Sequence, residues 1–172
     1  MALKELIEIS NLEYVLRNIY EWIRSVDQKI SIFIVFQGIT ITVLSPQIYS
    51  LVLKKSQHVS FVYKVILIFS FLLFLSEIIL LLISLMARLK NKTNSKSLIY
   101  FGDIPEVSLN DYQKSVFNLN REIYKEDLIR QCYISARIAS LKYKLFNKSV
   151  ILFIAGSFLI IVEFLLIHFK FI

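Results

Sequence analysis

The chain is poor in the residues that build redox, metal and enzyme sites. It has one cysteine, Cys132, and two histidines, His58 and His168, so the sequence predicts neither an intramolecular disulfide nor a metal site. Its three glycines and two prolines are scattered, and it contains no Walker loop, dinucleotide-binding glycine pattern, GxSxG elbow or HExxH helix. We therefore expect no enzyme activity, no cofactor and no bound metal.

Charge is missing from three long stretches of the sequence. Residues 30–53 carry no charged side chain, and residues 65–87 and 149–169 carry one carboxyl group each, Glu77 and Glu163. A helix needs about 20 apolar residues to cross a hydrocarbon core about 30 Å thick, and all three stretches are long enough. With 56% hydrophobic residues, the chain is too apolar for an ordinary soluble domain. The sequence predicts an all-α membrane protein with three transmembrane helices.

The basic residues predict how these spans are oriented. Sixteen of the 20 Lys and Arg residues lie in residues 1–29 and 88–148. Three crossings put both segments on the same side of the membrane, and the positive-inside rule makes that side cytoplasmic. We therefore expect a multi-pass protein of the plasma membrane, with a cytoplasmic arm at 1–29, spans at 30–53, 65–87 and 149–169, and a cytoplasmic insert at 88–148. The arm lacks the pattern of a signal peptide.

The arm and the insert have helical patterns of their own. Apolar residues recur in the arm at steps of three and four, which predicts an amphipathic helix that packs against the insert or lies on the inner leaflet: Leu6, Ile9, Leu12, Leu16, Ile19 and Ile23. In the mostly helical insert, Ser108 and Asp111 predict a helix start, and residues 98–104 favour a short extended segment. A helix without glycine or proline should begin near Asn120 and continue into the third span.

Polar residues repeat every seven positions within the second and third spans. The second span has Ser70, Glu77 and Ser84, and the third has Gly156, Glu163 and Lys170. Because a seven-residue step returns to the same helical face, each span should turn one polar stripe away from lipid. Intramembrane carboxyl groups usually face a bundle interior or a wet cavity and mark function. Glu77 and Glu163 are therefore candidates for a role in a pore or an oligomer. The structural alternatives are a protonated carboxyl group bonded to a neighbouring serine and a glutamate near the end of a span that reaches the interface.

The insert contains candidates for binding a charged ligand. Arg130 and Arg137 lie seven residues apart on the predicted long helix, and guanidinium groups match phosphate oxygens. Aromatic side chains could stack on a base, and a carboxylate could accept a hydrogen bond from a base or ribose. The candidate residues are Tyr100, Phe101, Asp103, Arg130, Arg137, Lys142 and Tyr143. Attraction of basic residues to anionic lipid, worth about 1 kcal/mol each, is the alternative explanation for the cations.

Short motifs in this order resemble those of a known family. They are Asp27-Gln28-Lys29 before the first span, Tyr100-Phe101-Gly102-Asp103-Ile104 with Tyr112 downstream, Asp127-Leu128-Ile129-Arg130-Gln131, Ala136-Arg137-Ile138-Ala139, and Lys142-Tyr143. Together with the spans, they make the chain similar, from about residue 22 onward, to the transmembrane effectors of Pycsar and related bacterial anti-phage systems.

The resemblance implies a function that composition alone does not reveal. It implies a bacterial inner-membrane effector that responds to a cyclic nucleotide made by a partner cyclase, assembles as a homo-oligomer and impairs the membrane, so that the infected cell stops growing or dies. It implies no nucleic-acid polymer as partner. Two alternatives stay open: a non-enzymatic accessory subunit that binds a protein or anionic lipid, and a holin-like toxin that needs no ligand.

Overall fold

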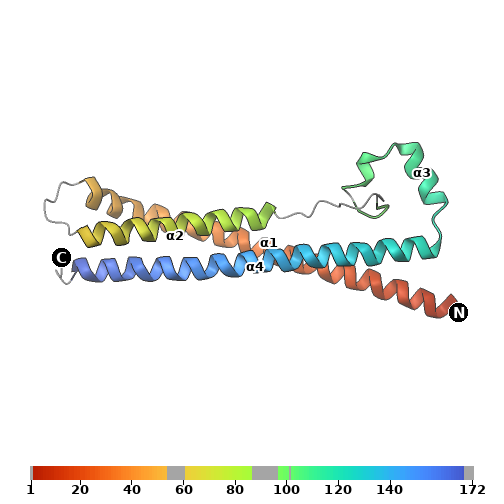
Figure 1. Cartoon of the computed structure of the whole chain (residues 1–172), viewed down its shortest axis with the longest axis horizontal. Coiled ribbons are helices and arrows are strands. Elements are labelled where there is room, and N and C mark those ends of the chain that lie inside the picture. The colour runs from red at the N-terminus through yellow and green to blue at the C-terminus, as the bar shows by residue number, and fades with distance from the viewer. Residues whose placement is uncertain (1, 54–60, 87–96, 101, 169–172) are drawn as a thin grey trace. The chain divides into compact units, whose positions relative to one another are not determined.

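The computed structural model describes residues 2–53, 61–86, 97–100 and 102–168. These residues form four α-helices and one short 3₁₀ helix, and none of them lies in a strand (Figure 1). In chain order the elements are α1 (Ala2–Leu53), α2 (Phe61–Met86), the 3₁₀ helix η1 (Ile104–Glu106), α3 (Leu109–Phe117) and α4 (Arg121–His168). The predicted all-α class is confirmed.

The helix boundaries partly follow the sequence prediction. The helix expected to begin near Asn120 and enter the third span is confirmed as α4. The arm and the first span, which were predicted as two segments, belong to the single helix α1. No glycine or proline occurs in α1 before Gly38, so no residue with a strong preference for breaking a helix separates the two parts.

The expected extended segment at residues 98–104 was wrong. The amide N–H of Asp103 donates to the carbonyl of Tyr100 at 3.0 Å, which closes a turn, and η1 follows directly. Pro105 stands in the first turn of η1, where its fixed backbone angle favours a helical turn and its missing N–H costs nothing. The aromatic and aliphatic composition of this segment therefore serves a folded turn.

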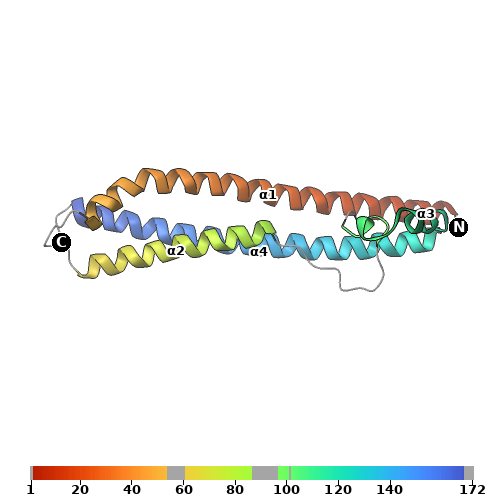
Figure 2. The same ribbon diagram turned by 90° about the horizontal axis from the view of Figure 1, so that it is seen from above.

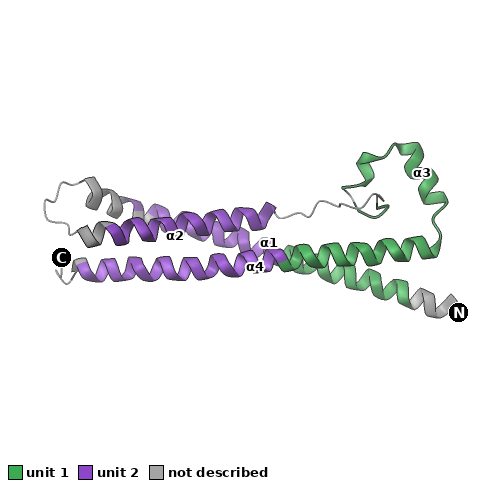
Figure 3. Cartoon of the chain, in the orientation of Figure 1, with its two compact units in different colours: residues 1–25, 88–140 green, residues 26–87, 141–172 purple. Residues whose placement is uncertain are grey.

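Contacts divide the chain into two compact units (Figure 3). Unit 1 comprises residues 1–25 and 88–140, and unit 2 comprises residues 26–87 and 141–172. Two boundaries, after residues 25 and 140, fall before the predicted edges of the membrane region at 30 and 149, and the third coincides with the predicted end of the second span at 87. The helices α1 and α4 each contribute one part to each unit.

In unit 1, the N-terminal part of α1 packs against α4. Lys125 forms an ion pair with Glu8, the hydroxyl of Tyr124 donates to Glu13 at 2.7 Å, and the Cys132 thiol donates to the carbonyl of Leu12 at 3.6 Å. Most of the predicted apolar stripe of the arm is shielded: Leu16 is buried, and Ile9, Leu12, Ile19 and Ile23 are half-buried. The arm was predicted to pack against the insert or to lie on the inner leaflet, and in the structure it packs against the insert.

In unit 2, parts of α1, α2 and α4 run alongside one another (Figure 2). Its small apolar core consists of Val26, Ile30 and Leu81. An aromatic cluster continues from this core, in which the Phe153 ring has its centroid 5.1 Å from that of Phe33 and 6.0 Å from that of Phe74, both edge to face. Ring contacts of this kind stabilise helix packing beyond the area they bury.

Within the described part of the chain, two helices are long and apolar enough to cross a membrane: α2 over Val65–Met86 and α4 within Arg121–Leu166. Only 22% and 17% of their most apolar windows are buried inside the molecule, so most of their apolar side chains point outward, unlike those of a soluble core helix. The predicted first span, residues 30–53, lies in α1, and the side chains of 46–53 fall outside the described part of the chain. Three spans therefore stay a prediction.

Candidate functional site

The candidate site in unit 1 is built around the loop that begins at Ser97. The Ser97 hydroxyl is buried and accepts hydrogen bonds from the amides of Ile99 and Tyr100, at 3.2 and 3.1 Å. The amide of Ser97 donates to the Asp103 carboxylate at 2.9 Å. These bonds pair the polar groups of a loop that has no ladder or helix of its own, as buried backbone requires.

Asp127 of α4 anchors this loop. One oxygen of its buried carboxylate accepts from the Ser97 hydroxyl at 2.9 Å and from the Leu98 amide at 3.0 Å. Its other oxygen pairs with the Arg130 guanidinium at 2.6 Å, one turn along the helix. A carboxylate with three donors is held in a fixed position. Tyr112 adds a bond from α3, because its hydroxyl donates to the Leu98 carbonyl at 3.3 Å.

Gly102 lets an aromatic side chain fold back over the loop. A Cβ atom at this position would lie 2.5 Å from the Tyr100 ring, which is closer than real atoms approach. The sequence Tyr100-Phe101-Gly102-Asp103 therefore needs its glycine for the ring position of Tyr100 and not for backbone strain. Phe101 itself lies outside the described residues.

The structure connects three of the seven predicted ligand-binding residues. Tyr100, Asp103 and Arg130 belong to one hydrogen-bonded network in unit 1, which runs through Ser97 and Asp127. Arg137 lies two turns further along α4, is exposed, and has its guanidinium carbon 5.8 Å from the centroid of the Tyr133 ring. Arg137 is thus a cation on the surface of unit 1, while Arg130 already neutralises a carboxylate.

Lys142 and Tyr143 belong to unit 2, where they have other partners. The Lys142 ammonium is buried, pairs with the Asp27 carboxylate at 2.6 Å and donates to the carbonyl of Leu85 at 3.1 Å. Leu85 lies in the last turn of α2, where carbonyls lack helical partners and a cation is favourable. The Ser84 hydroxyl donates to the carbonyl of Lys142 at 3.0 Å. Lys142 therefore joins all three helices of unit 2.

Tyr143 faces a second cation of the same unit. The Lys29 ammonium lies 5.6 Å from the centroid of the Tyr143 ring, a cation–π contact. The motif Asp27-Gln28-Lys29 of α1 thus meets the motif Lys142-Tyr143 of α4 twice within unit 2. Nothing in the sequence spacing predicted this pairing, because 115 residues separate Lys142 from Asp27.

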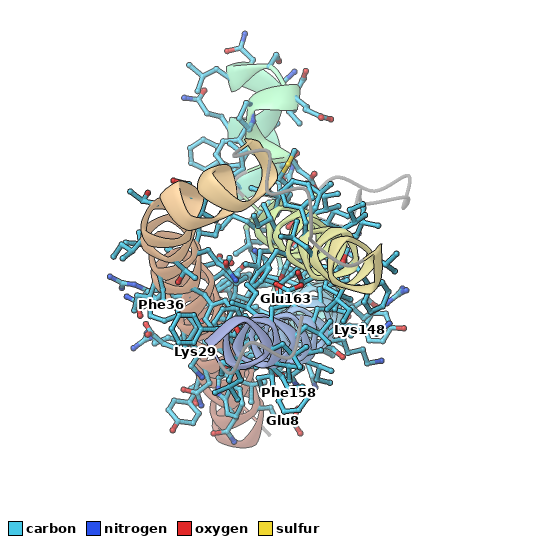
Figure 4. The ribbon with its side chains drawn as sticks, turned by 90° about the vertical axis from the view of Figure 1, so that its left-hand side faces the viewer. Glu8, Lys29, Phe36, Lys148, Phe158 and Glu163 are labelled. Atoms are coloured by element: carbon cyan, nitrogen blue, oxygen red, sulfur yellow. The ribbon has the colours of Figure 1, made fainter. Side chains whose placement is uncertain are left out.

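The two predicted membrane carboxyl groups are both buried in unit 2. Glu77 is fully buried and accepts a hydrogen bond from the Gln37 amide of α1, and Glu163 is 6% exposed. Figure 4 shows Glu163 on the inner side of α4, toward α2, with Phe158 on the opposite side of the helix. Ser70, Ser84 and Gly156 are buried as well, so the prediction that both polar stripes turn inward is confirmed, except for Lys170, which lies outside the described residues.

Sequence reasoning did not select several residues that shape these sites. Asp27, Asp127 and Gln131 were named only as parts of motifs, and Ser97 and Gln37 were not candidates at all. All but Asp27 are buried polar residues, and Gln131 has an amide nitrogen with no hydrogen-bond partner among the described residues. A signal was present for Asp127 and Arg130, whose three-residue spacing on a helix permits an ion pair.

The chain matches the model of a known protein family. No curated protein and no solved structure matches the chain. The family model described as "Pycsar effector protein domain" matches residues 11–168, which include both units, the Asp127 network and the buried carboxyl groups. Because this match extends over nearly the whole sequence, the chain belongs to the Pycsar effector family.

Proposed function

We propose that this protein is a membrane effector of a bacterial anti-phage system. In this proposal, a cyclic nucleotide made by a partner cyclase binds to unit 1, and unit 2 then impairs the inner membrane, in which the chain assembles as a homo-oligomer. The observation that carries the proposal is the family match over residues 11–168, which supports an anti-phage effector role and associates the chain with cyclic-nucleotide signalling.

The apolar surface of unit 2 supports a membrane location. Large hydrophobic side chains are exposed along all three of its helices, among them Ile32 at 70%, Phe71 at 62% and Ile151 at 65%. Water would make so large an apolar surface costly, whereas lipid accepts it. We place the arm and the insert in the cytoplasm, since sixteen of the 20 basic residues lie there.

Unit 1 offers the chemistry that a cyclic nucleotide requires. The Arg137 guanidinium is exposed and can pair with the phosphate, and the Tyr100 ring over Gly102 can stack on a base. Asp103 belongs to the same loop and can accept from a base or ribose donor. Arg130 contributes by keeping Asp127, the anchor of the loop, in place.

A ligand can switch the protein only by preferring one conformation. A compound that binds two arrangements equally shifts neither, and a change from 1:99 to 99:1 needs about 10⁴-fold preference. We expect the loop from Ser97 to Asp103 to differ between the conformation that binds ligand and the one that does not. A few hydrogen bonds, to Asp127 and Tyr112, hold its position.

The test is isothermal titration of the purified full chain with a panel of cyclic mononucleotides and cyclic oligonucleotides. We expect saturable binding of one class, lost in Arg137→Ala and kept in the matched control Arg121→Ala, which removes another exposed arginine of α4. Gly102→Ala should weaken binding without loss of stability, because the added methyl group displaces only the Tyr100 ring.

Each alternative function predicts a different result. An accessory subunit binds no compound of the panel but binds anionic vesicles or a protein. A holin-like toxin kills cells on expression without any cyclase. Binding of a cyclic nucleotide that survives Arg137→Ala would move the site away from the predicted residues.

A further inference from the structure

The interior of unit 2 contains a line of polar residues beside its small apolar core, although its exterior is apolar. Among the described residues of this unit, the buried ones along α4 are Lys142, Ser149, Gly156 and Glu163, at steps of seven. Along α2 they are Ser70, Glu77, Leu81 and Ser84, and α1 adds Gln37 to the apolar Val26 and Ile30. We call the set Gln37, Ser70, Glu77, Ser84, Lys142, Ser149, Gly156 and Glu163 the polar seam.

The polar seam is long enough to cross the hydrocarbon core. From Lys142 to Glu163 there are 21 residues of continuous helix, which rise about 31 Å at 1.5 Å per residue, and the core is about 30 Å thick. Small residues such as Ser149 and Gly156 explain close helix packing. Close packing by small residues does not explain why the seam also contains two carboxyl groups and an amide.

Three oxygen atoms of the seam have no hydrogen-bond partner among the described residues. They are Oε1 of Gln37, Oε1 of Glu77 and Oε1 of Glu163, and each belongs to a side chain that is at least nine-tenths buried. An unsatisfied buried polar atom costs about 1–3 kcal/mol, and an ionised carboxylate in hydrocarbon costs far more. The seam therefore needs protons or water beside these atoms.

An aromatic ring separates the two carboxyl groups. The Phe74 ring lies against Gly156, where an added Cβ would be 3.2 Å from Cε2 of the ring. This contact puts Phe74 and Gly156 at the same depth. Since Glu77 is three residues from Phe74 on one helix and Glu163 is seven residues from Gly156 on the antiparallel one, the carboxyl groups are about 15 Å apart along the axis. That distance exceeds a hydrogen bond several-fold.

We propose that the polar seam is a proton path through a single copy of the chain, with Glu77 and Glu163 as its proton-binding groups and the Phe74 ring against Gly156 as the closed gate between them. Intramembrane carboxyl groups in series are the usual carriers of protons across bilayers, and an aromatic ring that excludes water closes such a path. The inference rests on the proposed function for its membrane location and its trigger.

Each step along the path transfers one proton and nothing else. A hydronium ion at one end of the seam gives its proton to the Glu163 carboxylate and becomes water. The Glu163 acid then gives this proton to a water molecule within the seam, and the hydronium so formed passes it to the Glu77 carboxylate. Glu77 finally releases the proton to water at the other end, so that both carboxylates and all water molecules are regenerated. Gln37 holds the Glu77 carboxyl group by its hydrogen bond. The Asp27 and Lys142 ion pair at the other end of the seam provides the charged exit to water.

The test measures proton flux into vesicles that contain the purified full chain and a pH-sensitive dye. A potassium gradient with valinomycin supplies the driving voltage. We expect Phe74→Ala to raise flux about tenfold or more over wild type, which corresponds to about 1.4 kcal/mol of barrier. The matched control Phe71→Ala removes an exposed ring of the same helix and should leave flux unchanged. Adding Glu163→Gln to Phe74→Ala should return flux to the wild-type level.

Three results would overturn the proton path. They are equal flux in Phe74→Ala and Phe71→Ala, full flux in the Glu163→Gln double variant, and escape of a large fluorescent solute together with protons, which indicates a wide pore. These assays need no nucleotide. Failure of the wild-type protein to bind any cyclic nucleotide would therefore refute the proposed trigger and leave the flux comparison intact.

A spectroscopic measurement covers variants that fold poorly. Infrared spectra of the wild-type protein should show the carbonyl band of a protonated carboxylic acid that shifts when the membranes are moved into D₂O, because seam protons exchange with water. The band should weaken in the isosteric Glu163→Gln and not in Glu126→Gln, an exposed carboxyl of unit 1. If the frequency of the band does not change in D₂O, the buried carboxyl groups do not exchange protons with water, and the proposed path is overturned.

Discussion

The two units use parts of the same helices in opposite ways. In unit 1, α4 exposes charged residues such as Arg121, Glu122 and Glu126, and its buried Asp127 has three hydrogen-bond donors. In unit 2, α4 exposes Ile151, Ile154 and Phe158 and buries Ser149 and Glu163. The exposed surface of this continuous helix is thus polar in unit 1 and apolar in unit 2.

The difference indicates which solvent each unit meets. Water favours exposed charge, and most buried polar atoms of soluble domains have hydrogen-bond partners. In hydrocarbon, burying apolar side chains between helices gains no hydrophobic free energy, so small and polar residues can occupy the interior. Unit 1 therefore depends on individual hydrogen bonds, whereas unit 2 depends on the polar seam and on the ion pair of the buried Lys142 with the half-buried Asp27.

The largest effect is expected from breaking the ion pair of unit 2. Asp27→Ala leaves the Lys142 ammonium buried without its carboxylate and should destabilise the protein by about 3 kcal/mol. Denaturation with SDS in mixed micelles measures the loss. The control Glu21→Ala removes an exposed carboxyl of the same helix, and equal loss in both variants would contradict a buried pair. Adding Lys142→Met to Asp27→Ala should recover part of the stability.

A smaller and local effect is expected from Asp127→Ala in unit 1. The substitution removes the acceptor of the Ser97 hydroxyl and the Leu98 amide, at a local cost of about 2 kcal/mol. Hydrogen exchange at Leu98 should become about 30-fold faster, while α2 remains unaffected. Glu122→Ala, an exposed carboxyl of the same helix, serves as the control. Unchanged exchange at Leu98 would show that the loop has another anchor.

The third effect concerns the start of α3. The Ser108 hydroxyl accepts from the Asp111 amide and donates to the Asp111 carboxylate at 2.7 Å. Ser108→Ala should cost about 1 kcal/mol and loosen the first turn of α3 without moving the rest of unit 1. Exchange of the Asp111 amide reports the loss, and Ser115→Ala later in the same helix should not reproduce it.

The smallest effect depends on pH and lies in unit 1, outside the predicted spans. The hydrogen bond to Glu13, followed by partial burial, raises the pKa of Tyr124 to about 12. Because the folded-state pKa is above the usual value of about 10, this contribution to stability is fully present below pH 10 and disappears between about pH 10 and 12. Ultraviolet titration should lose one late tyrosine transition in Tyr124→Phe, and Glu13→Gln should shift it to lower pH.

The helices and the faces that they turn inward could be predicted from local pattern, whereas the partners of the candidate site could not. The capping pair Ser108 and Asp111, the long helix α4 and the inward stripes of Glu77 and Glu163 depend on residues close in sequence, and all were confirmed. The turn after Tyr100 was missed because Leu, Ile, Tyr and Phe suit a strand, whereas Pro105 and the hydrogen bonds around Ser97 decide the local structure.

The sequence by itself determined that the chain is helical, that it has long apolar segments and that its polar residues share helical faces, because these properties follow from composition and from the 3.6-residue period. Only the tertiary structure decided the partners. It joined Lys142 to Asp27, Gln37 to Glu77 and Asp127 to Ser97, over separations of 115, 40 and 30 residues. Such pairs depend on how the helices pack in three dimensions, and helical periodicity carries no information about which face meets which.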